Sequence, residues 1–119
     1  FGGKQEENNT GNLIADNAVR YINEHYGDDI TLSELASLSG VSPQYFDRVF
    51  RERLNMRPME YIARVKISKA KSMLLDSDIS VTQLSKSLGY TGPTYFGIVF
   101  KKYEGISPSE FRKNSGSVI

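Results

Sequence analysis

The sequence lacks cysteine and has a single histidine, His25, among its 119 residues. Without cysteine the chain forms neither a disulfide nor a thiolate metal site, and a reducing compartment is the natural interpretation. One histidine without a second nitrogen or sulfur ligand does not make a metal site, and the sequence has no Gly-rich phosphate loop or nucleophile motif. The sequence therefore predicts a protein that is not an enzyme and that carries no metal or cofactor.

Long hydrophobic runs are also missing. No stretch is apolar enough to span a bilayer and no signal-peptide pattern is present, so we expect a cytoplasmic protein with no membrane partner. The chain begins at Phe1 rather than at Met, and residues 1–12 are rich in Gly, Asn and Gln, which predicts a flexible interdomain linker. We therefore expect a monomeric fragment of a larger protein, with residues 115–119 as a frayed tail.

What the chain does contain is a repeated pattern. The first copy comprises Leu35, Gly40, Ser42, Tyr45, Phe46, Val49, Phe50, Arg51, Pro58, Glu60 and Tyr61, and the second comprises Leu84, Gly89, Thr91, Tyr95, Phe96, Val99, Phe100, Lys101, Pro108, Glu110 and Phe111. Each copy predicts a short helix, a turn at Gly40 or Gly89, and a second helix with polar and basic residues on one face. This is the pattern of a helix-turn-helix, and two in tandem indicate DNA binding.

Charge is distributed unevenly along the chain, although the net charge is only +1. Residues 1–34 hold two basic and seven acidic side chains, which leaves 13 basic against seven acidic in residues 35–119, a net charge of +6. A positive charge that coincides with the repeats is what neutralisation of DNA phosphates requires.

Helical periodicity and capping residues predict an all-α fold of about seven helices. We expect a first helix from near Leu13 to Tyr26, capping boxes at Thr31 and Ser80, and a short last helix after Ser107. Ser42 with Pro43 and, in the second copy, Pro93 predict the starts of helices that reach about Leu54 and Glu104. The predicted parts are a linker over 1–12, a first lobe over 13–57, a connecting helix over 58–75 and a second lobe over 76–114.

The connecting helix, from about Met59 to Leu75, is predicted to bury one face. Its apolar positions are Ile62, Val65, Ala70, Met73 and Leu74, which leaves Arg64, Lys69 and Lys71 outside. At about 1.5 Å per residue this helix is roughly 25 Å long, so it allows the two second helices to lie about 34 Å apart, one turn of B-DNA.

Several motifs resemble the C-terminal signature of AraC/XylS-type transcription regulators. In the second half these are Gly89-Tyr90, Tyr95-Phe96, the segment 100–103, Gly105-Ile-Ser-Pro108 and Glu110-Phe-Arg112, and the first half is similar at Leu35-Ala36, Gly40-Val-Ser42, Tyr45-Phe46, Phe50-Arg51 and Pro58. The resemblance covers roughly residues 15–113. It implies an all-α DNA-binding domain with two helix-turn-helix lobes, the output end of a regulator, usually an activator that contacts RNA polymerase.

Carried onto this sequence, the resemblance implies that the first recognition helix presents Pro43, Gln44, Asp47 and Arg48 to base edges. Gln44 can pair with adenine and Arg48 with guanine, and Asp47 can accept from cytosine or orient Arg48. The predicted phosphate contacts are Ser42, Arg51, Arg53, Arg64, Tyr95, Lys101 and Lys102. For Tyr45 and Tyr95 we expect a mixed role in packing and phosphate binding.

The second recognition helix departs from the family pattern, which commonly has a small hydroxyl residue followed by Arg where this chain has Gly97 and Ile98. Thr94 remains as a polar group, Gly97 permits close approach, and Ile98 can touch a thymine methyl. We therefore expect the second lobe to anchor the domain more than it specifies sequence.

A second interpretation is a helical protein-interaction module, whose basic face meets an acidic protein and which affects transcription without base readout. Paired recognition helices argue against it, because a protein partner does not need two of them one DNA turn apart. For the parent protein we expect an upstream partner domain, either a small-molecule sensor or a phosphorylatable receiver. The sequence does not specify the operator, the target genes or the direction of regulation.

Overall fold

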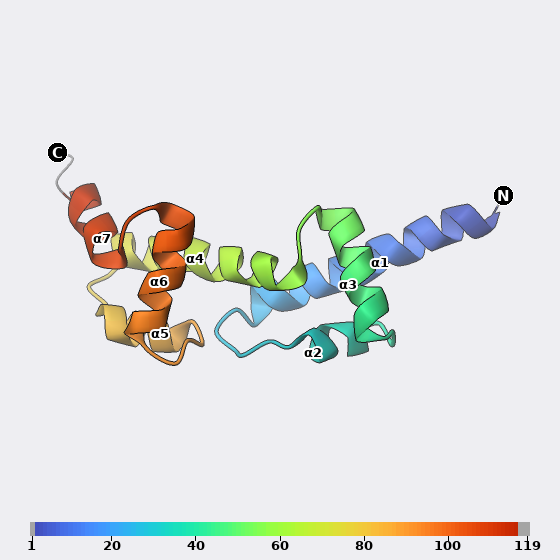
Figure 1. The fold of residues 1–119 in the computed structure, drawn as a ribbon, viewed down its shortest axis with the longest axis horizontal. Coiled ribbons are helices and arrows are strands. Elements are labelled where there is room, and N and C mark those ends of the chain that lie inside the picture. The colour runs from blue at the N-terminus through green and yellow to red at the C-terminus, as the bar shows by residue number, and fades with distance from the viewer. Residues whose placement is uncertain (1, 117–119) are drawn as a thin grey trace. The chain divides into compact units, whose positions relative to one another are not determined.

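The seven helices of the computed structural model account for most of the chain that it describes, which is the backbone of residues 2–116 and the side chains of residues 10–115. They are α1 (Gly2–Glu24), α2 (Leu32–Ser37), α3 (Pro43–Leu54), α4 (Pro58–Asp76), α5 (Val81–Ser87), α6 (Pro93–Glu104) and α7 (Pro108–Gly116). Figure 1 shows these elements, and no strand occurs in residues 2–116. The prediction of an all-α fold with about seven helices is confirmed.

Helix α3 begins and ends where local sequence signals place it. The Ser42 hydroxyl accepts a hydrogen bond from the Tyr45 N–H at 3.1 Å, and Pro43 follows as the first helical residue, where its missing N–H costs nothing. The helix ends at Asn55, whose φ of 59° is left-handed and whose N–H donates to the Arg51 carbonyl. The predicted bounds of this helix are confirmed.

Helix α6 has the same length as α3 but a weaker start. Gly92 is its N-cap and provides no side-chain hydrogen bond, so only Pro93 marks the first turn. The helix ends at Gly105, with φ 84°, in the left-handed conformation that glycine adopts without steric cost. Helices α3 and α6 therefore end in the same left-handed C-cap conformation, but only α3 has a side-chain N-cap.

Helix α1 begins much earlier than predicted. The linker expected over residues 1–12 was inferred from Gly and Asn content, yet the backbone is helical from Gly2, while Phe1 lies outside the described residues. Gly11 is buried, and a Cβ placed there would lie 2.6 Å from Arg53 Nη2. The glycine thus leaves room for the Arg53 side chain to cross the helix, a packing reason that composition does not reveal. At the other end α7 reaches Gly116, so the tail predicted from residue 115 begins within this helix, and residues 117–119 are outside the description.

The contacts divide the chain into two units. The first contains residues 1–25 and 30–62, and the second contains residues 26–29 and 63–119. The division falls inside α4, after Ile62, rather than at the ends of a separate connecting helix, and the loop from Tyr26 to Asp29 packs with the second unit. Phe46 and Phe50 of α3 are fully buried in the first unit, and Phe96 and Phe100 of α6 are fully buried in the second.

Helix α4 follows its predicted bounds within one residue, but its buried face differs from the prediction. Ile62, Ala70 and Leu74 are buried as expected, whereas Val65 and Met73 are only partly buried. Lys66, 7% exposed, lies inside instead. A lysine was not expected there because its hydrogen-bond partners are distant in the sequence.

Candidate nucleic-acid interface

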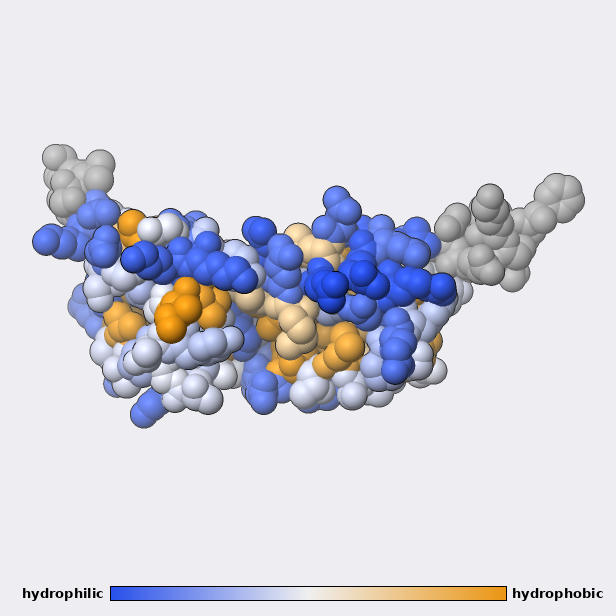
Figure 2. Space-filling model, in the orientation of Figure 1, coloured by the Kyte–Doolittle hydropathy of each residue, from blue (hydrophilic) through white to orange (hydrophobic). Residues whose placement is uncertain are grey.

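The outer face of α3 is polar because its inner face is fixed in the core of the first unit. Phe46 and Phe50 are fully buried, with ring centroids 5.6 Å apart, and this orients the opposite side of the helix outward. Gln44 and Arg48 are exposed there, and Pro43 is partly exposed. Figure 2 shows hydrophilic surface over α3. Of the four α3 residues that the sequence predicts to read bases, Gln44 and Arg48 are thus accessible, although the contact itself stays a prediction.

Arg48 lies over an aromatic ring of its own helix. Its guanidinium carbon is 5.1 Å from the centroid of the Tyr45 ring, a cation–π geometry. Tyr45 is 36% exposed, so the pair is at the surface. This contact restricts the positions that the guanidinium takes, and the exposed side chain can still donate hydrogen bonds to a base.

Asp47 pairs with a different arginine from Arg48, the one that the sequence suggested. Its Oδ2 atom lies 3.0 Å from Arg51 Nε, four residues further along α3, so it orients Arg51 rather than Arg48. The i,i+4 spacing was the signal that could have predicted this pair. Since a partly exposed i,i+4 ion pair contributes little to stability, this pair does not exclude the predicted contact of Asp47 with cytosine.

Two predicted phosphate residues of the first unit already have structural roles. The Ser42 hydroxyl caps α3, and Arg53 lies against α1 at Gly11. Both residues are exposed, so these roles do not exclude a phosphate contact. Among the arginines predicted to bind phosphate, Arg51 is exposed and forms the ion pair with Asp47.

Helix α6 presents an apolar outer face in place of the polar face of α3. Tyr95 is 56% exposed and Ile98 is 64% exposed, and Thr94 is also at the surface. Apolar surface is visible over α6 in Figure 2. Nothing lies within 4 Å of the position of a Cβ at Gly97, so this face is open to close approach. This exposed apolar face is compatible with the predicted anchoring role, and the contact of Ile98 with a thymine methyl stays a prediction.

Tyr103 brings together cations that the sequence predicted separately. Arg64 of α4 and Lys102 of α6 lie with their charged groups 5.3 Å and 5.6 Å from the centroid of its ring. Lys101 is exposed on the same helix, while Lys71 pairs with Glu104 at 3.0 Å. Tyr103 belongs to the motif at residues 100–103, but a role in gathering cations was not predicted for it, because an aromatic residue near a helix end is equally consistent with a core position.

At the start of α6 the aromatic contacts continue inward. The Tyr90 ring is in edge contact with Tyr95 at 5.8 Å and in tilted contact with Phe96 at 5.4 Å. Burial raises the pKa of Tyr90 to about 12, with smaller contributions from Tyr95 and Tyr103. The first turn of the second recognition helix therefore rests on a neutral, partly buried ring.

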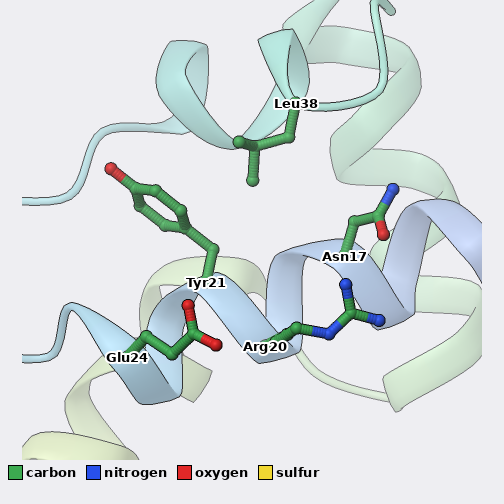
Figure 3. Close-up of a pocket in the computed structure, with 5 residues that line it drawn as sticks. All are labelled: Asn17, Arg20, Tyr21, Glu24 and Leu38. Atoms are coloured by element: carbon green, nitrogen blue, oxygen red, sulfur yellow. The ribbon is translucent and has the colours of Figure 1, made fainter.

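The first unit has a surface hollow between α1 and the end of α2. Figure 3 shows that it is lined by Asn17, Arg20, Tyr21 and Glu24 of α1 and by Leu38. Its volume of about 280 Å³ is below the range of about 300–1,000 Å³ usual for small-molecule pockets.

Among the described residues no group of His, Asp and Glu side chains could hold a metal ion. The helices of this part of the chain also include none with the length and apolar character of a membrane span.

Comparison with known proteins agrees with this geometry. The family model described as "Helix-turn-helix domain" matches residues 35–114. The "Uncharacterized HTH-type transcriptional regulator YisR" of Bacillus subtilis (strain 168) is 34% identical over 100 residues, which cover 84% of this chain and 35% of that protein. The "Msm operon regulatory protein" of Streptococcus mutans is 28% identical over 109 residues, covering 92% of this chain and 39% of that protein. The chain thus spans little more than a third of these curated relatives.

Solved structures share the fold. The C-terminal domain of AraT, a response regulator from Geobacillus stearothermophilus, has a TM-score of 0.82 at 29% identity, covering 85% of this chain and 84% of that one. The DNA-binding domain of AdpA, described as a global transcriptional factor in complex with a target DNA, has a TM-score of 0.80 at 25% identity, covering 84% of this chain and 90% of that one.

Proposed function

Since this chain belongs to the AraC-type family of helix-turn-helix domains, the DNA-binding domains of transcription regulators, we propose that it reads DNA unequally with its two units. In this proposal α3 specifies the sequence from one major groove, and α6 anchors the domain in the next. The observation that carries it is the contrast between the outer faces of the helices. Gln44 and Arg48 are exposed on the outer face of α3, whereas the outer face of α6 exposes Ile98.

The α3 side of the proposal depends on chemistry that can discriminate bases. Arg48 offers two donors to guanine O6 and N7, and Gln44 offers a donor and an acceptor to adenine. The Tyr45 ring holds the Arg48 guanidinium, and Asp47 holds Arg51 where it can reach a phosphate. Together these residues give α3 both base-reading and backbone-contacting groups.

On the α6 side the proposed contacts are mainly to phosphate. Lys101 and Lys102 are exposed near the end of the helix, and Tyr95 is exposed near its start. A backbone contact fixes the register of the domain without reading the sequence. Ile98 adds an apolar contact that favours thymine.

The partners of the whole protein are also proposals. We propose that the domain is the output end of a longer activator, which contacts RNA polymerase and receives its signal from a sensor or receiver domain. The relatives support this, because the chain spans 35% and 39% of their lengths. With promoter DNA as its partner, the proposed site of action is the bacterial cytoplasm, at the nucleoid.

Two variants separate reading from anchoring. Arg48→Ala should lose roughly 1–3 kcal/mol on the preferred duplex and relax the preference at one base pair, because it removes a base contact. Lys101→Ala should weaken preferred and random duplexes about equally. Fluorescence anisotropy titrations of both variants on both duplexes measure the difference, and each variant is the control for the other. If Arg48→Ala weakens both duplexes to the same degree, Arg48 contacts the backbone and α3 does not read that base.

A further inference from the structure

Lys66 is buried inside the second unit and uses its whole ammonium group. Its Nζ atom donates to the carbonyl oxygens of Tyr26 at 2.6 Å and of Asp28 at 2.9 Å, and also to that of Leu88. An ammonium has three donors, so all of them are used. Burial lowers the pKa of Lys66, and the nearby charges of Asp29 and Asp28 oppose that shift. A cation held against this desolvation needs its three partners in place.

The three carbonyls belong to two segments that meet at the turn of the second helix-turn-helix. Leu88 is the C-cap of α5, and Gly89 follows with φ 84° and opens the turn into α6. A Cβ at Gly89 would lie 2.9 Å from the Gly27 carbonyl oxygen and 3.0 Å from Lys66 Nζ. The turn and the loop around Gly27 are therefore in backbone contact, with the lysine bonded to both.

The contact extends from Lys66 to the recognition helix through one ring. Lys66 Nζ lies 5.6 Å from the centroid of Tyr90, the residue after Gly89. That ring touches Tyr95 and Phe96 in the first turn of α6. Because α6 has no side-chain N-cap, these rings are a main support of its start.

The first unit provides an internal comparison. The repeat spacing between Gly40 and Gly89 is 49 residues, and by the same spacing Asn17 of the first unit is the counterpart of Lys66. Asn17 Nδ2 donates to the Ser39 hydroxyl at 3.3 Å, and nothing lies within 4 Å of a Cβ at Gly40. The first turn thus has an open surface and one long hydrogen bond from Asn17, whereas the second turn has three hydrogen bonds from a buried cation. The helix with the stronger support is the one without a side-chain cap.

We propose that Lys66 is a positioning residue for DNA binding by α6: it fixes the α5–α6 turn, and Tyr90 transmits that fixed geometry to the first turn of the recognition helix. The proposal rests on the proposed function of α6 as the anchoring helix. It assigns a DNA-binding role to a side chain that does not touch DNA.

The test compares Lys66→Met with Lys69→Met in the full chain. Both variants remove one positive charge from α4. Lys69 is exposed, and its Nζ atom lies 5.3 Å from the centroid of the Tyr26 ring, whereas Lys66 donates hydrogen bonds to backbone carbonyls. Binding to a labelled duplex is measured against salt, at a temperature where circular dichroism shows each variant to be folded. Lys66→Met should weaken binding about tenfold or more and make the log–log salt slope shallower by about 2, because the phosphate contacts of Lys101 and Lys102 are misplaced. Lys69→Met should change the slope by no more than about 0.9, the value of one phosphate.

Two further variants exclude a purely structural effect. Lys66→Arg keeps the donors and should restore most of the affinity and the slope. Tyr90→Leu leaves the lysine's hydrogen bonds and removes the ring, so it should also make the slope shallower, and it keeps the proposal testable if Lys66→Met does not fold. A folded Lys66→Met or Tyr90→Leu variant with the affinity and slope of Lys69→Met would overturn the proposal.

Hydrogen exchange distinguishes this proposal from the function on which it rests. In Lys66→Met the amides of the α5–α6 turn, at Gly89 and Tyr90, should exchange faster than in Lys69→Met. If the wild-type chain shows no salt-dependent binding to duplex DNA, the proposed function is wrong, and exchange still reports whether Lys66 orders the turn. Unchanged exchange at the turn would overturn the positioning role even where DNA binding is normal.

Discussion

Gly97, in the middle of α6, should be replaceable by alanine with a gain in stability. Glycine inside a helix costs about 0.5–1 kcal/mol relative to alanine, because it loses more backbone entropy on folding. At Gly97 nothing lies within 4 Å of a new Cβ, so no clash offsets this gain. Gly97→Ala should therefore raise the free energy of unfolding of the second unit by about 0.5–1 kcal/mol.

Two other glycines of the same unit are matched controls. Gly105 has φ 84° with open space around a Cβ, so Gly105→Ala should cost about 1–2 kcal/mol for the left-handed backbone alone. Gly89 has the same φ, but its Cβ would lie 2.9 Å from the Gly27 carbonyl oxygen and 3.1 Å from that of Asp28. Gly89→Ala should add a further cost of about 1–3 kcal/mol for overpacking.

Urea denaturation followed by circular dichroism gives the stabilities, and amide exchange at Phe96 and Phe100 reports the second unit separately. The predicted order of stability is Gly97→Ala, wild type, Gly105→Ala and Gly89→Ala. A destabilised Gly97→Ala, or a Gly89→Ala no worse than Gly105→Ala, would refute the reasoning. If Gly97 also permits close approach to DNA, the more stable Gly97→Ala variant should bind duplex DNA less tightly.

Two predictions concern charge. Binding of the wild-type chain to random duplex should weaken with salt, with a log–log slope of about −5 or steeper if five or more phosphates are contacted. Affinity unchanged between low and physiological salt would contradict DNA binding by the basic repeats. Because burial raises the pKa of Tyr90 from 10.0 to about 12, the folded chain keeps a proton there that the unfolded chain has lost, and stability should fall as pH rises through this interval. Urea titrations at alkaline pH should show a smaller loss for Tyr90→Phe, and equal losses would contradict the assignment.

Local signals were sufficient to predict the recognition helices. Ser42 and Pro43 lie next to each other, and the bonds that start and end α3 join residues three or four apart, so the helix could be delimited from its own sequence. The outward position of Gln44 and Arg48 was implied by the family resemblance, and both side chains are exposed in the structure. The pairing of Asp47 with Arg51 was equally local and could have been predicted from its i,i+4 spacing.

Long-range packing was what the sequence could not provide. The partners of Lys66 are backbone carbonyls 22 to 40 residues away, which carry no side-chain signal, so nothing in its own helix indicated that this lysine is buried. The start of α1 was missed for a similar reason, because Gly11 reads as a linker residue until Arg53 is seen against it. Tyr103 joins Arg64 to Lys102 across 38 residues, a juxtaposition that neither helix indicates alone.

Selection of binding sites from random duplexes tests the central claim, that α3 specifies and α6 anchors. The selected site should be lopsided, with a sharply defined half under α3 and, about 10 base pairs away, a half that is degenerate or merely rich in A·T. Ile98→Arg should sharpen the weak half towards guanine, because it adds the donors that α6 lacks at this exposed position. Equal information in both halves for the wild-type chain would contradict the account, since the α6 face with Gly97 and exposed Ile98 would then read DNA as well as Gln44 and Arg48 do.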